Sequence, residues 1–356
     1  MGPPHRAMEF CDRFRLRLPI LQAPMAGASR PELAIAVADA GGMGASGALQ
    51  DSPQRIAEWA RQFRAKSNGA FQLNIWIPES SKLDAQERQA RVDAASQFLR
   101  QFGAPPEADE PGQPPLIFSE QCSAMLAAQP TVMSSIMGLF PREVVTRMRE
   151  RGIAWFCCAT SLAEALAAEE AGADAIVAQG MEAGGHRGTF NQDEAERHQV
   201  GLFSLLPWFA DHLRIPIIAA GGIADGRGVA AALSLGASAV QVGTALLRSP
   251  EAGISPGWSQ ALDGLAPEDT VTTRAYTGRL ARAAPSPYLA AWTTPDAPRP
   301  APFPDQLGLV TRWRKGNSEG LDKANHWAGQ SAALATTDPA GEIVTRMWCD
   351  AKALLA

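Results

Sequence analysis

The sequence predicts an α/β fold of the (β/α)8 TIM-barrel type, with a small additional cap domain that is mostly helical. Eight short apolar runs occur along the chain, and nearly all of them are followed by a segment of helical composition. The runs do not alternate between apolar and polar residues, which is typical of parallel strands that are covered by helices. Eight such units within roughly 220 residues also match the usual size of a (β/α)8 barrel.

The predicted elements alternate regularly between strand and helix. The strands are expected at residues 19–25, 43–46, 71–77, 131–137, 153–159, 175–179, 216–220 and 239–243. Helices are expected between them at residues 31–40, 53–65, 141–151, 161–171, 202–213 and 226–235. Ser29 and Glu32 have the spacing of a capping box at the start of the first helix. Gly172 and Gly236 are predicted to end the helices that precede the sixth and eighth strands.

Two parts of the chain break this alternation and define the predicted domains. Residues 80–101 are polar and helical, and five prolines follow in residues 104–115. Seven prolines lie in residues 284–304, a basic polar stretch follows at 312–318, and helices are expected again at 321–335 and 342–355. We therefore assign residues 1–79 and 115–250 to the barrel, 80–114 and 251–325 to cap and substrate segments, and 326–356 to C-terminal helices packed on the barrel.

The composition excludes several classes of protein. The 356 residues are 46% hydrophobic and 19% charged, which excludes a disordered chain. The net charge of −5 and the lack of a basic run argue against a nucleic-acid or polybasic membrane partner. The first residues do not resemble a secretory signal, and no apolar run approaches the ~20 residues that span a bilayer. A soluble cytoplasmic protein, monomeric or homodimeric, is expected.

The cysteines do not indicate a disulfide framework or a zinc site. There are five of them, and none has C-x-x-C spacing. Cys157 and Cys158 lie within an apolar run, so they are predicted to be core residues, with thiol catalysis as the alternative.

Glycines follow the last two predicted strands, where barrels of this type usually bind phosphate. Gly221 and Gly222 end the seventh strand, and Gly243 ends the eighth after Gln241 and Val242. Backbone N–H groups at glycines can approach an anion closely, and Thr244 adds a hydroxyl donor. The alternative is that these glycines only form tight turns.

Two polar side chains in apolar strands suggest a planar ligand. Asn74 and Gln179 would each be costly to bury without hydrogen-bond partners, by about 1–3 kcal/mol. A flavin mononucleotide (FMN) would satisfy both of them and also fill the phosphate site, with Ala23, Pro24 and Met25 lining its ring. The alternative is that both are satisfied core amides. The lack of a G-x-G-x-x-G after the first strand argues against a Rossmann dinucleotide site.

His186 is the candidate reactive group, because it lies in a glycine-rich loop with Gly184 and Gly185 at the predicted active face. A neutral imidazole can take a proton from carbon, and a charged one can hold an anionic substrate. A structural histidine is the alternative. The remaining histidines have surface-like contexts and lack metal-ligand spacing: His5, His198, His212 and His326.

Several of these segments resemble the nitronate monooxygenase family, formerly called 2-nitropropane dioxygenases. They are PILQAPMAG at 19–27, AQGMEAGGHRG at 178–188 and residues 219–244, with TGRLAR at 277–282 and WAGQ at 327–330 in the tail. The resemblance implies an FMN-dependent barrel that oxidises alkyl nitronates, such as propionate 3-nitronate, with O2 to a carbonyl compound and nitrite. Asn74, Gln179, Gly184, Gly222 and residues 241–244 would bind FMN. His186 would act as a base toward a nitroalkane or would position the nitronate.

Two departures from the family pattern bear on the substrate. Where the family often has an aromatic–His–aromatic–Gly stretch, this chain has VMSSIMG at 132–138, and Ile136 stands in place of the histidine. Residues 312–321 also depart from the pattern.

Other functions remain open from the sequence. FMN-dependent enoyl-acyl-carrier-protein reductases, which use NADH or NADPH, share the E-A-G-G-H loop, and related flavin-dependent NAD(P)H:quinone reductases have carried the older family name. The TGRLAR and WAGQ segments favour the monooxygenase. Arg312, Arg314 and Lys315 form the kind of basic patch that a carrier protein would need. A flavin-binding protein without enzymatic activity is the third hypothesis.

Overall fold

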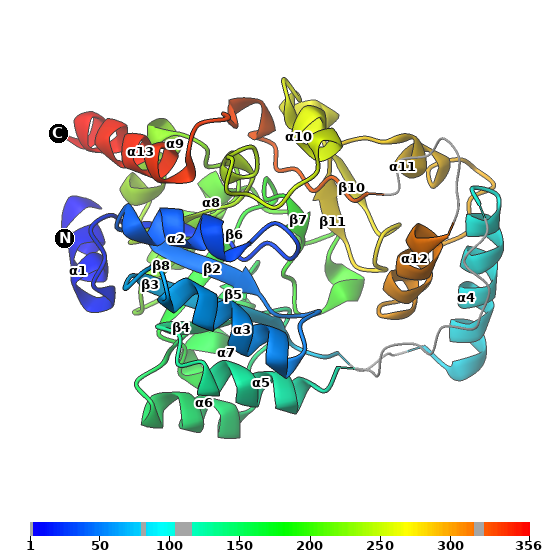
Figure 1. Ribbon diagram of the computed structural model, residues 1–356, viewed down its shortest axis with the longest axis horizontal. Helices are drawn as coiled ribbons and strands as arrows, with labels where there is room; N and C mark the ends of the chain where they lie inside the picture. Colours follow the sequence, from blue (N-terminus) through cyan, green and yellow to red (C-terminus); the bar gives the residue numbers. More distant parts are fainter. Residues whose placement is uncertain (1–2, 80–82, 104–115, 317–323) are drawn as a thin grey trace.

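Eight parallel strands form a closed barrel, which confirms the predicted fold class (Figure 1). The computed structural model describes residues 3–79, 83–103, 116–316 and 324–356. Around the barrel the strands follow the order β1 (Ile20–Gln22), β2 (Met43–Gly47), β3 (Ala70–Trp76), β4 (Val132–Ile136), β5 (Ala154–Ala159), β6 (Ala175–Gln179), β8 (Ile217–Ala220) and β9 (Ala239–Val242). The barrel closes where β9 pairs with β1. Each strand overlaps one of the eight predicted apolar runs.

The predicted helices lie on the outside of this barrel. They are α2 (Pro31–Asp39), α3 (Pro53–Arg64), α6 (Arg142–Glu150), α7 (Leu162–Ala171), α8 (Leu202–Ala210) and α9 (Gly226–Ser234). The C-terminal helix α13 (Ala340–Leu355) packs on α2 and α9. One continuous apolar core lies between the strands and these helices. A second apolar cluster fills the barrel interior, which explains why the strands are apolar on both faces.

Local details at the helix ends differ in part from the sequence analysis. The predicted capping box is wrong, because α2 begins after Arg30 and the Ser29 hydroxyl accepts hydrogen bonds from Gln22 and the Met25 N–H. Gly172 ends α7 in the left-handed conformation, with φ +95°, as predicted. Gly236 lies directly after Leu235, the C-cap residue of helix α9, and has a φ of +113°.

The first helix, α1 (Pro3–Phe14), was not predicted, and it closes the amino-terminal end of the barrel. Its buried residues Phe10 and Phe14 contact Phe156, whose side chain points into the barrel interior. The same cluster includes the first residues of several strands, such as Met43 and Val132. Helix α1 and the cap therefore lie at opposite ends of the molecule (Figure 1).

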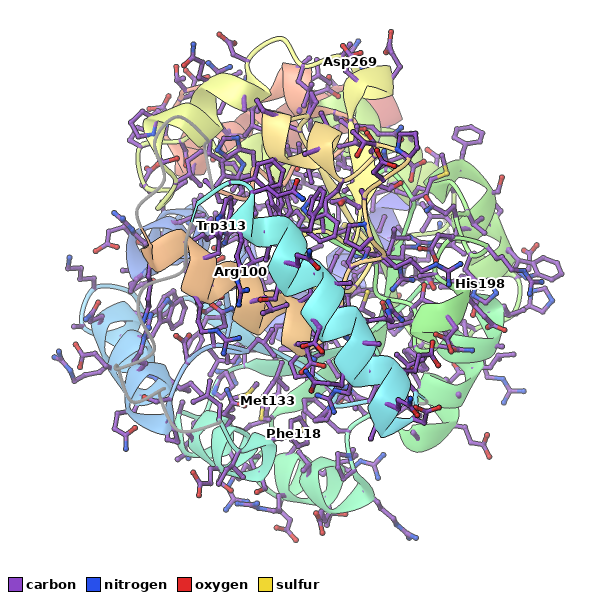
Figure 2. The ribbon with its side chains drawn as sticks, turned by 90° about the vertical axis from the view of Figure 1, so that its right-hand side faces the viewer. Arg100, Phe118, Met133, His198, Asp269 and Trp313 are labelled. Atoms are coloured by element: carbon purple, nitrogen blue, oxygen red, sulfur yellow. The ribbon has the colours of Figure 1, made fainter. Side chains whose placement is uncertain are left out.

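The cap lies at the carboxyl ends of the strands. It contains α4 (Ala85–Arg100), α11 (Pro287–Ala291), α12 (Asp305–Lys315) and a small antiparallel sheet in the order β10 (Val271–Thr273), β11 (Ala281–Ala283) and β7 (Gly185–His186). Figure 2 shows α4, with Arg100, side by side with α12, with Trp313. The two helices are joined by Arg88, which binds both carboxylate oxygens of Asp305 at 2.6 and 2.8 Å. Residues from these elements share an apolar cluster of their own.

Other expectations for the connecting segments were only partly correct. The helix predicted at 321–335 is wrong for residues 324–335, which contain only the short turn Ala332–Leu334, and residues 321–323 lie outside the described ranges. Helix α4 confirms most of the helix expected at 80–101, although 80–82 and the proline-rich 104–115 are not described. Helices α5 (Phe118–Ala127), α10 (Pro256–Leu262) and α12 were not predicted. The domain boundaries stay predictions. Among the described residues, no helix has the length and apolar character that crossing a membrane requires.

Candidate active site

A cavity of about 590 Å³ lies at the carboxyl ends of the barrel strands, beneath the cap. Most of the residues that the sequence analysis singled out line it. They are Ala23, Pro24, Met25, Asn74, Gln179, Gly184, Gly185, His186, Gly221, Gly222, Gln241, Gly243 and Thr244. These residues come from the ends of five strands, and closing the barrel brings them together.

Val242 is the exception among the predicted site residues. Its side chain is 1% exposed and packs in the core between strands and helices, whereas its neighbours Gln241 and Gly243 line the cavity. The reason is that successive side chains of a strand point to opposite faces. The Val242 side chain therefore does not line the cavity, and a contact of its backbone with FMN stays a prediction.

His186 is held in the cavity wall by contacts on several sides. Its backbone lies in β7 and pairs with Ala281 of β11. Its Nε2 atom is 2.9 Å from the hydroxyl of Thr277. The rings of Trp76 and Trp327 lie edge-on to the imidazole, with centroids 4.5 and 4.8 Å away. These contacts fix the orientation of the imidazole plane.

The imidazole of His186 is neutral at physiological pH. Burial lowers its pKa, and the positive charge of Arg279 lowers it further, to about 3. Part of the His186 side chain is accessible. This side chain lines the cavity, where aromatic rings such as that of Trp76 surround it rather than bulk water. A neutral imidazole has one nitrogen without a proton, which is what a general base requires.

Arg279 is buried beside this histidine, and it is 3% exposed. Its guanidinium lies over the ring of Phe303 at 4.7 Å and over that of Trp76 at 5.7 Å. It forms an ion pair with Glu79 at 3.5 Å and contacts the sulfur of Met137 at 2.8 Å. Burial lowers the pKa of Arg279 to about 10, so the guanidinium keeps its charge at neutral pH.

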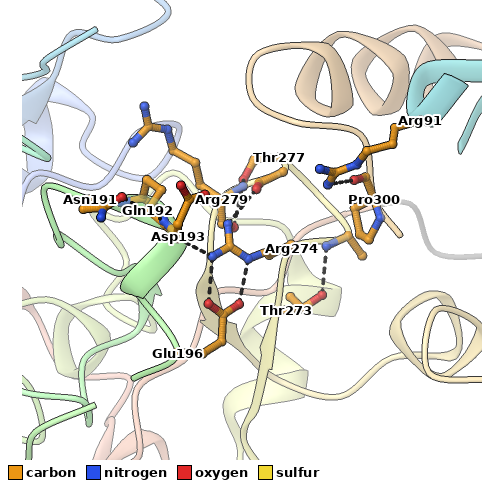
Figure 3. A network of polar contacts seen from close by, with 12 residues as sticks. Arg91, Asn191, Gln192, Asp193, Glu196, Thr273, Arg274, Thr277, Arg279 and Pro300 are labelled. Atoms are coloured by element: carbon orange, nitrogen blue, oxygen red, sulfur yellow. Dashed lines mark hydrogen bonds and ion pairs between the residues drawn. The ribbon is translucent and has the colours of Figure 1, made fainter. Parts of the chain in front are cut away.

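A second arginine fixes the turn that carries Thr277 and Arg279. Arg274 donates to both carboxylate oxygens of Glu196 at 2.7 and 2.9 Å, and to the carbonyl of Gln192 at 2.6 Å (Figure 3). The turn between β10 and β11 is thereby tied to the loop that follows β7. The positions of Thr277 and Arg279 relative to His186 consequently depend on contacts outside the barrel.

The two predicted strand amides have different surroundings. Gln179 is satisfied by the histidine loop, because its Nε2 donates to the carbonyl of His186 at 3.0 Å and its Oε1 accepts from the Gly188 N–H at 2.7 Å. Both ends of the Gln179 amide thus have partners within the protein, as the alternative of a satisfied core amide predicted. Asn74 donates to the backbone and hydroxyl oxygens of Ser134. Its own oxygen has no donor among the described residues, and the residue lines the cavity.

Gln241 is oriented by a chain of buried glutamines. Gln72, which is fully buried, donates to the Gln241 Oε1 atom at 3.2 Å and to the backbone oxygen of Gln22 at 3.1 Å. Since this contact occupies the oxygen of Gln241, its NH2 group is the end available to the cavity. A ligand that fits this position offers a hydrogen-bond acceptor.

The ends of β8 and β9 form a cradle of hydrogen-bond donors. Gly221 and Gly222 have φ values of +116° and +68°, which are strained for residues with a side chain. Their N–H groups and that of Thr244 donate to no atom in the part of the chain that the structure describes. The Thr244 hydroxyl accepts from the Gly329 N–H at 3.0 Å, which leaves its own proton for a ligand. Ser331 donates to the Gly222 carbonyl at 2.6 Å and so helps to fix this turn.

The charges around the cavity also favour anions. Of the described residues that line it, none is an aspartate or a glutamate, whereas Arg314 and Lys315 of α12 contribute positive charge. The third member of the predicted basic patch, Arg312, is exposed on the same helix and does not line the cavity.

The remaining candidate groups fit a structural role. Cys157 and Cys158 are buried, as predicted, and burial raises the pKa of the Cys157 thiol to about 12 and that of Cys158 as well. Thiol catalysis is therefore not supported. His326, expected at the surface, is 6% exposed and packs near Trp258. Among the described residues, no cluster of His, Cys, Asp and Glu could hold a metal ion.

Several residues of the site were not predicted by the sequence analysis. Trp76, Tyr276, Thr277, Trp327, Gly329 and Ser331 all line the cavity. The TGRLAR and WAGQ segments contain three of these residues, Thr277, Trp327 and Gly329, although the resemblance to the family predicted no site role for them. Ile136 also lines the cavity, so the position where the family often has a second histidine belongs to the site.

The fold and this site define a class: a (β/α)8-barrel enzyme whose active site lies at the carboxyl ends of the strands. A sequence model of the family described as "Nitronate monooxygenase" matches residues 9–350. The chain therefore belongs to the nitronate monooxygenase family, a family of flavin-dependent oxidoreductases.

Known proteins agree with this membership. The chain is 39% identical to "Nitronate monooxygenase" from Paraburkholderia phytofirmans over 338 residues, which covers 92% of this chain and 91% of that protein. It is similar to the crystal structure of nitroalkane oxidase from Streptomyces ansochromogenes, with a TM-score of 0.83 and 34% identity over 98% of this chain and 99% of that one. FabK from Thermotoga maritima is less similar, with a TM-score of 0.73 and 27% identity over 98% and 96% of the two chains.

Proposed function

We propose that this protein is an FMN-dependent monooxygenase that oxidises alkyl nitronates, such as propionate 3-nitronate, with O2 to a carbonyl compound and nitrite. The observation that carries the proposal is a neutral His186 in a cavity that also contains an anion cradle. A base and an anion cradle in one pocket suit a nitroalkane or nitronate bound beside a phosphorylated cofactor. Relatives at 34–39% identity that are named for this activity support the assignment.

The residues present fit FMN. The free N–H groups of Gly221, Gly222 and Thr244, together with the Thr244 hydroxyl, form a donor set suited to a phosphate. The oxygen of Asn74 and the NH2 group of Gln241 offer an acceptor and a donor to a heteroaromatic ring. Ala23, Pro24 and Met25 would line the same ring. When bound, FMN supplies the electron acceptor for the nitronate and the reaction with O2.

The chain's own residues bind the substrate and move its proton. Arg314 and Lys315 attract an anionic nitronate into the cavity, and the absence of acidic residues among the described lining residues avoids repulsion. The rings of Trp76 and Trp327 pack against the imidazole and reduce its contact with water. His186 accepts the proton from the carbon of a neutral nitroalkane, or positions a nitronate that is already deprotonated.

The reductase alternatives have less support, because the relatives at 34–39% identity carry the monooxygenase name. Arg314 and Lys315 lie at the cavity and could bind an acidic carrier protein, so a carrier-protein substrate is an alternative that an experiment has to test. Anaerobic stopped-flow absorbance of the flavin distinguishes the two functions. Reduction by propionate 3-nitronate alone, with nitrite released after O2 is admitted, is the expected result. Rapid reduction by NADH or NADPH with no response to the nitronate would contradict the proposal. A protein that responds to neither donor would match the flavin-binding hypothesis.

Thr244→Val is expected to weaken FMN binding about 10- to 100-fold, because a hydrogen bond to a charged group contributes about 1.5–3 kcal/mol. Valine has nearly the same shape but lacks the hydroxyl proton that faces the cradle. Fluorescence quenching on titration of the flavin-free protein with FMN measures the dissociation constant. Thr345→Val, at an exposed position of α13, is the matched control. Equal affinity in wild type and Thr244→Val would remove this hydroxyl from the phosphate site.

The pH dependence of nitroalkane turnover follows from the lowered pKa of His186. A base whose pKa is about 3 stays unprotonated as the pH falls from neutrality to pH 5. We therefore expect kcat/KM to show no histidine titration between about pH 5 and 8, where an ordinary histidine changes its charge. Initial-rate measurements across this range, corrected for ionisation of the nitroalkane itself, test this. A loss of activity centred near pH 6.5 would contradict it.

The cytoplasmic location, the monomeric or homodimeric state and the absence of a nucleic-acid partner stay predictions.

A further inference from the structure

The TGRLAR segment, residues 277–282, is the support of the histidine loop. Its Ala281 pairs with His186 and its Arg282 pairs with Gly185 in the small antiparallel sheet. The Arg282 side chain also donates to the carbonyl of Met181, at the start of the same loop, at 3.0 Å. The first residue of the segment, Thr277, reaches the imidazole itself.

The hydroxyl of Thr277 has three polar neighbours. Its oxygen lies 2.9 Å from the His186 Nε2 atom, 3.3 Å from the Arg279 backbone nitrogen and 3.4 Å from the Arg279 backbone oxygen. A hydroxyl has one proton to donate and two lone pairs to accept. The Arg279 N–H can only donate, so it takes one lone pair.

The other two neighbours decide where the proton lies. If the hydroxyl donated to Nε2, a lone pair of its oxygen would face the carbonyl oxygen of Arg279, and that contact would be repulsive. If the hydroxyl donates to this carbonyl in a long, weak bond, the second lone pair accepts a proton from Nε2. All three contacts are then favourable, and His186 carries its proton on Nε2.

We propose that Thr277 is a positioning residue that holds His186 in the Nε2–H tautomer and leaves Nδ1 as the proton acceptor. The hydrogen bond at one imidazole nitrogen sets the protonation of the other. Nδ1 has no hydrogen-bond partner among the described residues, and the side chain lines the cavity. The rings of Trp76 and Trp327, packed against the imidazole, oppose a ring flip that would exchange the two nitrogens.

The proton-transfer step follows from this assignment and rests on the proposed function. The C–H bond next to the nitro group breaks, and its proton moves to Nδ1 of His186. The electron pair of that bond forms a C=N bond, and the negative charge resides on the nitro oxygens of the resulting nitronate. The imidazolium keeps the hydrogen bond from its Nε2–H to the hydroxyl oxygen of Thr277. This oxygen therefore accepts a proton from Nε2 in both the neutral and the charged state of His186.

The tautomer can be read directly by long-range 1H–15N NMR of the enzyme labelled with 15N-histidine. His186→Asn identifies the signals of His186 among those of the five histidines. Wild type is expected to show a protonated Nε2 and an unprotonated Nδ1. Thr277→Val is expected to give the other tautomer or a mixture, and Thr277→Ser is expected to restore the wild-type pattern. A protonated Nδ1 in wild type, or an unchanged pattern in Thr277→Val, would overturn the proposal.

Kinetics provide a second, separate readout. Thr277→Val is expected to lower kcat/KM for a neutral nitroalkane about 10- to 100-fold, which is part of the ~10²- to 10⁴-fold that a positioned general base contributes. The loss with a preformed nitronate should be smaller, because no proton is removed from carbon. Thr293→Val, an exposed threonine in the cap whose hydroxyl donates to the Ala290 carbonyl, is the control. Equal losses with both substrates would overturn the positioning role.

The two tests also separate this proposal from the proposed function. If the wild-type enzyme turns over neither nitroalkane nor nitronate, the proposed function fails, and the NMR measurement still decides the tautomer. Circular dichroism and the thermal midpoint of each variant show whether it has folded. If Thr277→Val does not fold, the NMR patterns of the wild type and of Thr277→Ser decide whether His186 is the Nε2–H tautomer.

Discussion

Replacing His186 by asparagine is expected to lower turnover of a neutral nitroalkane by about 10²- to 10⁴-fold, and that of a preformed nitronate by less, while FMN stays bound. A positioned general base contributes about 10²- to 10⁴-fold to the rate, and asparagine cannot accept a proton at neutral pH. Asparagine is close in size to part of the imidazole and can still occupy the space between Trp76 and Trp327. Oxygen uptake and nitrite release measure turnover, and flavin absorbance of the purified variant measures FMN content.

Two comparisons make this experiment specific. His212→Asn changes an exposed histidine at the end of α8 and is expected to behave like wild type. A larger loss with the nitroalkane than with the nitronate would indicate a base, and equal losses would indicate a positioning role. A variant that is purified without FMN would show that the histidine is structural and would contradict the proposed role.

Replacing Phe10 by alanine is expected to lower the free energy of unfolding by about 3–5 kcal/mol, as buried Phe→Ala changes typically do. Phe10 is 2% exposed in the cluster that closes the amino-terminal end of the barrel. Its ring centroid lies 4.7 Å from that of Phe14 and 6.0 Å from that of Phe156. The truncation leaves a cavity that the closed barrel cannot collapse to fill. Denaturant unfolding followed by circular dichroism measures the change.

Met8 provides the control on the same helix, because its side chain is 62% exposed. Met8→Ala is expected to change stability by less than about 0.5 kcal/mol. The active-site cavity lies at the opposite end of the barrel, so KM of the folded Phe10→Ala variant should stay near the wild-type value. A loss below about 1 kcal/mol for Phe10→Ala would mean that α1 contributes little to the closed barrel.

The barrel was predictable because its signal is local. Each strand overlaps an apolar run of a few residues, most of these runs are followed closely by a glycine or a polar residue, and most are followed by a segment of helical composition. Helix α1 has a local pattern as well, because Ala7, Phe10, Cys11 and Phe14 are buried at helical spacing. The cap and the segment that follows it were less predictable, because α12 and the turn at residues 332–334 depend on packing between distant segments.

The candidate site was predictable where it lies on strand ends. Thirteen of the fourteen predicted residues line one cavity, since the carboxyl ends of parallel strands meet at one end of a barrel. Val242 did not follow, because its side chain points away from the interior. Gln179 lines the cavity, yet its amide is satisfied by the histidine loop, a contact that depends on how that loop folds back.

The sequence by itself determined the barrel, its amide-lined and glycine-rich strand ends and the histidine at the active face. These features depend on short-range patterns and on strand order. Tertiary structure alone decided how that histidine is held, because Thr277 is 91 residues away along the chain and reaches it only through the pairing of β7 with β11. The neutral charge of His186 was decided in the same way. It results from burial and from Arg279, which the cap turn places beside it.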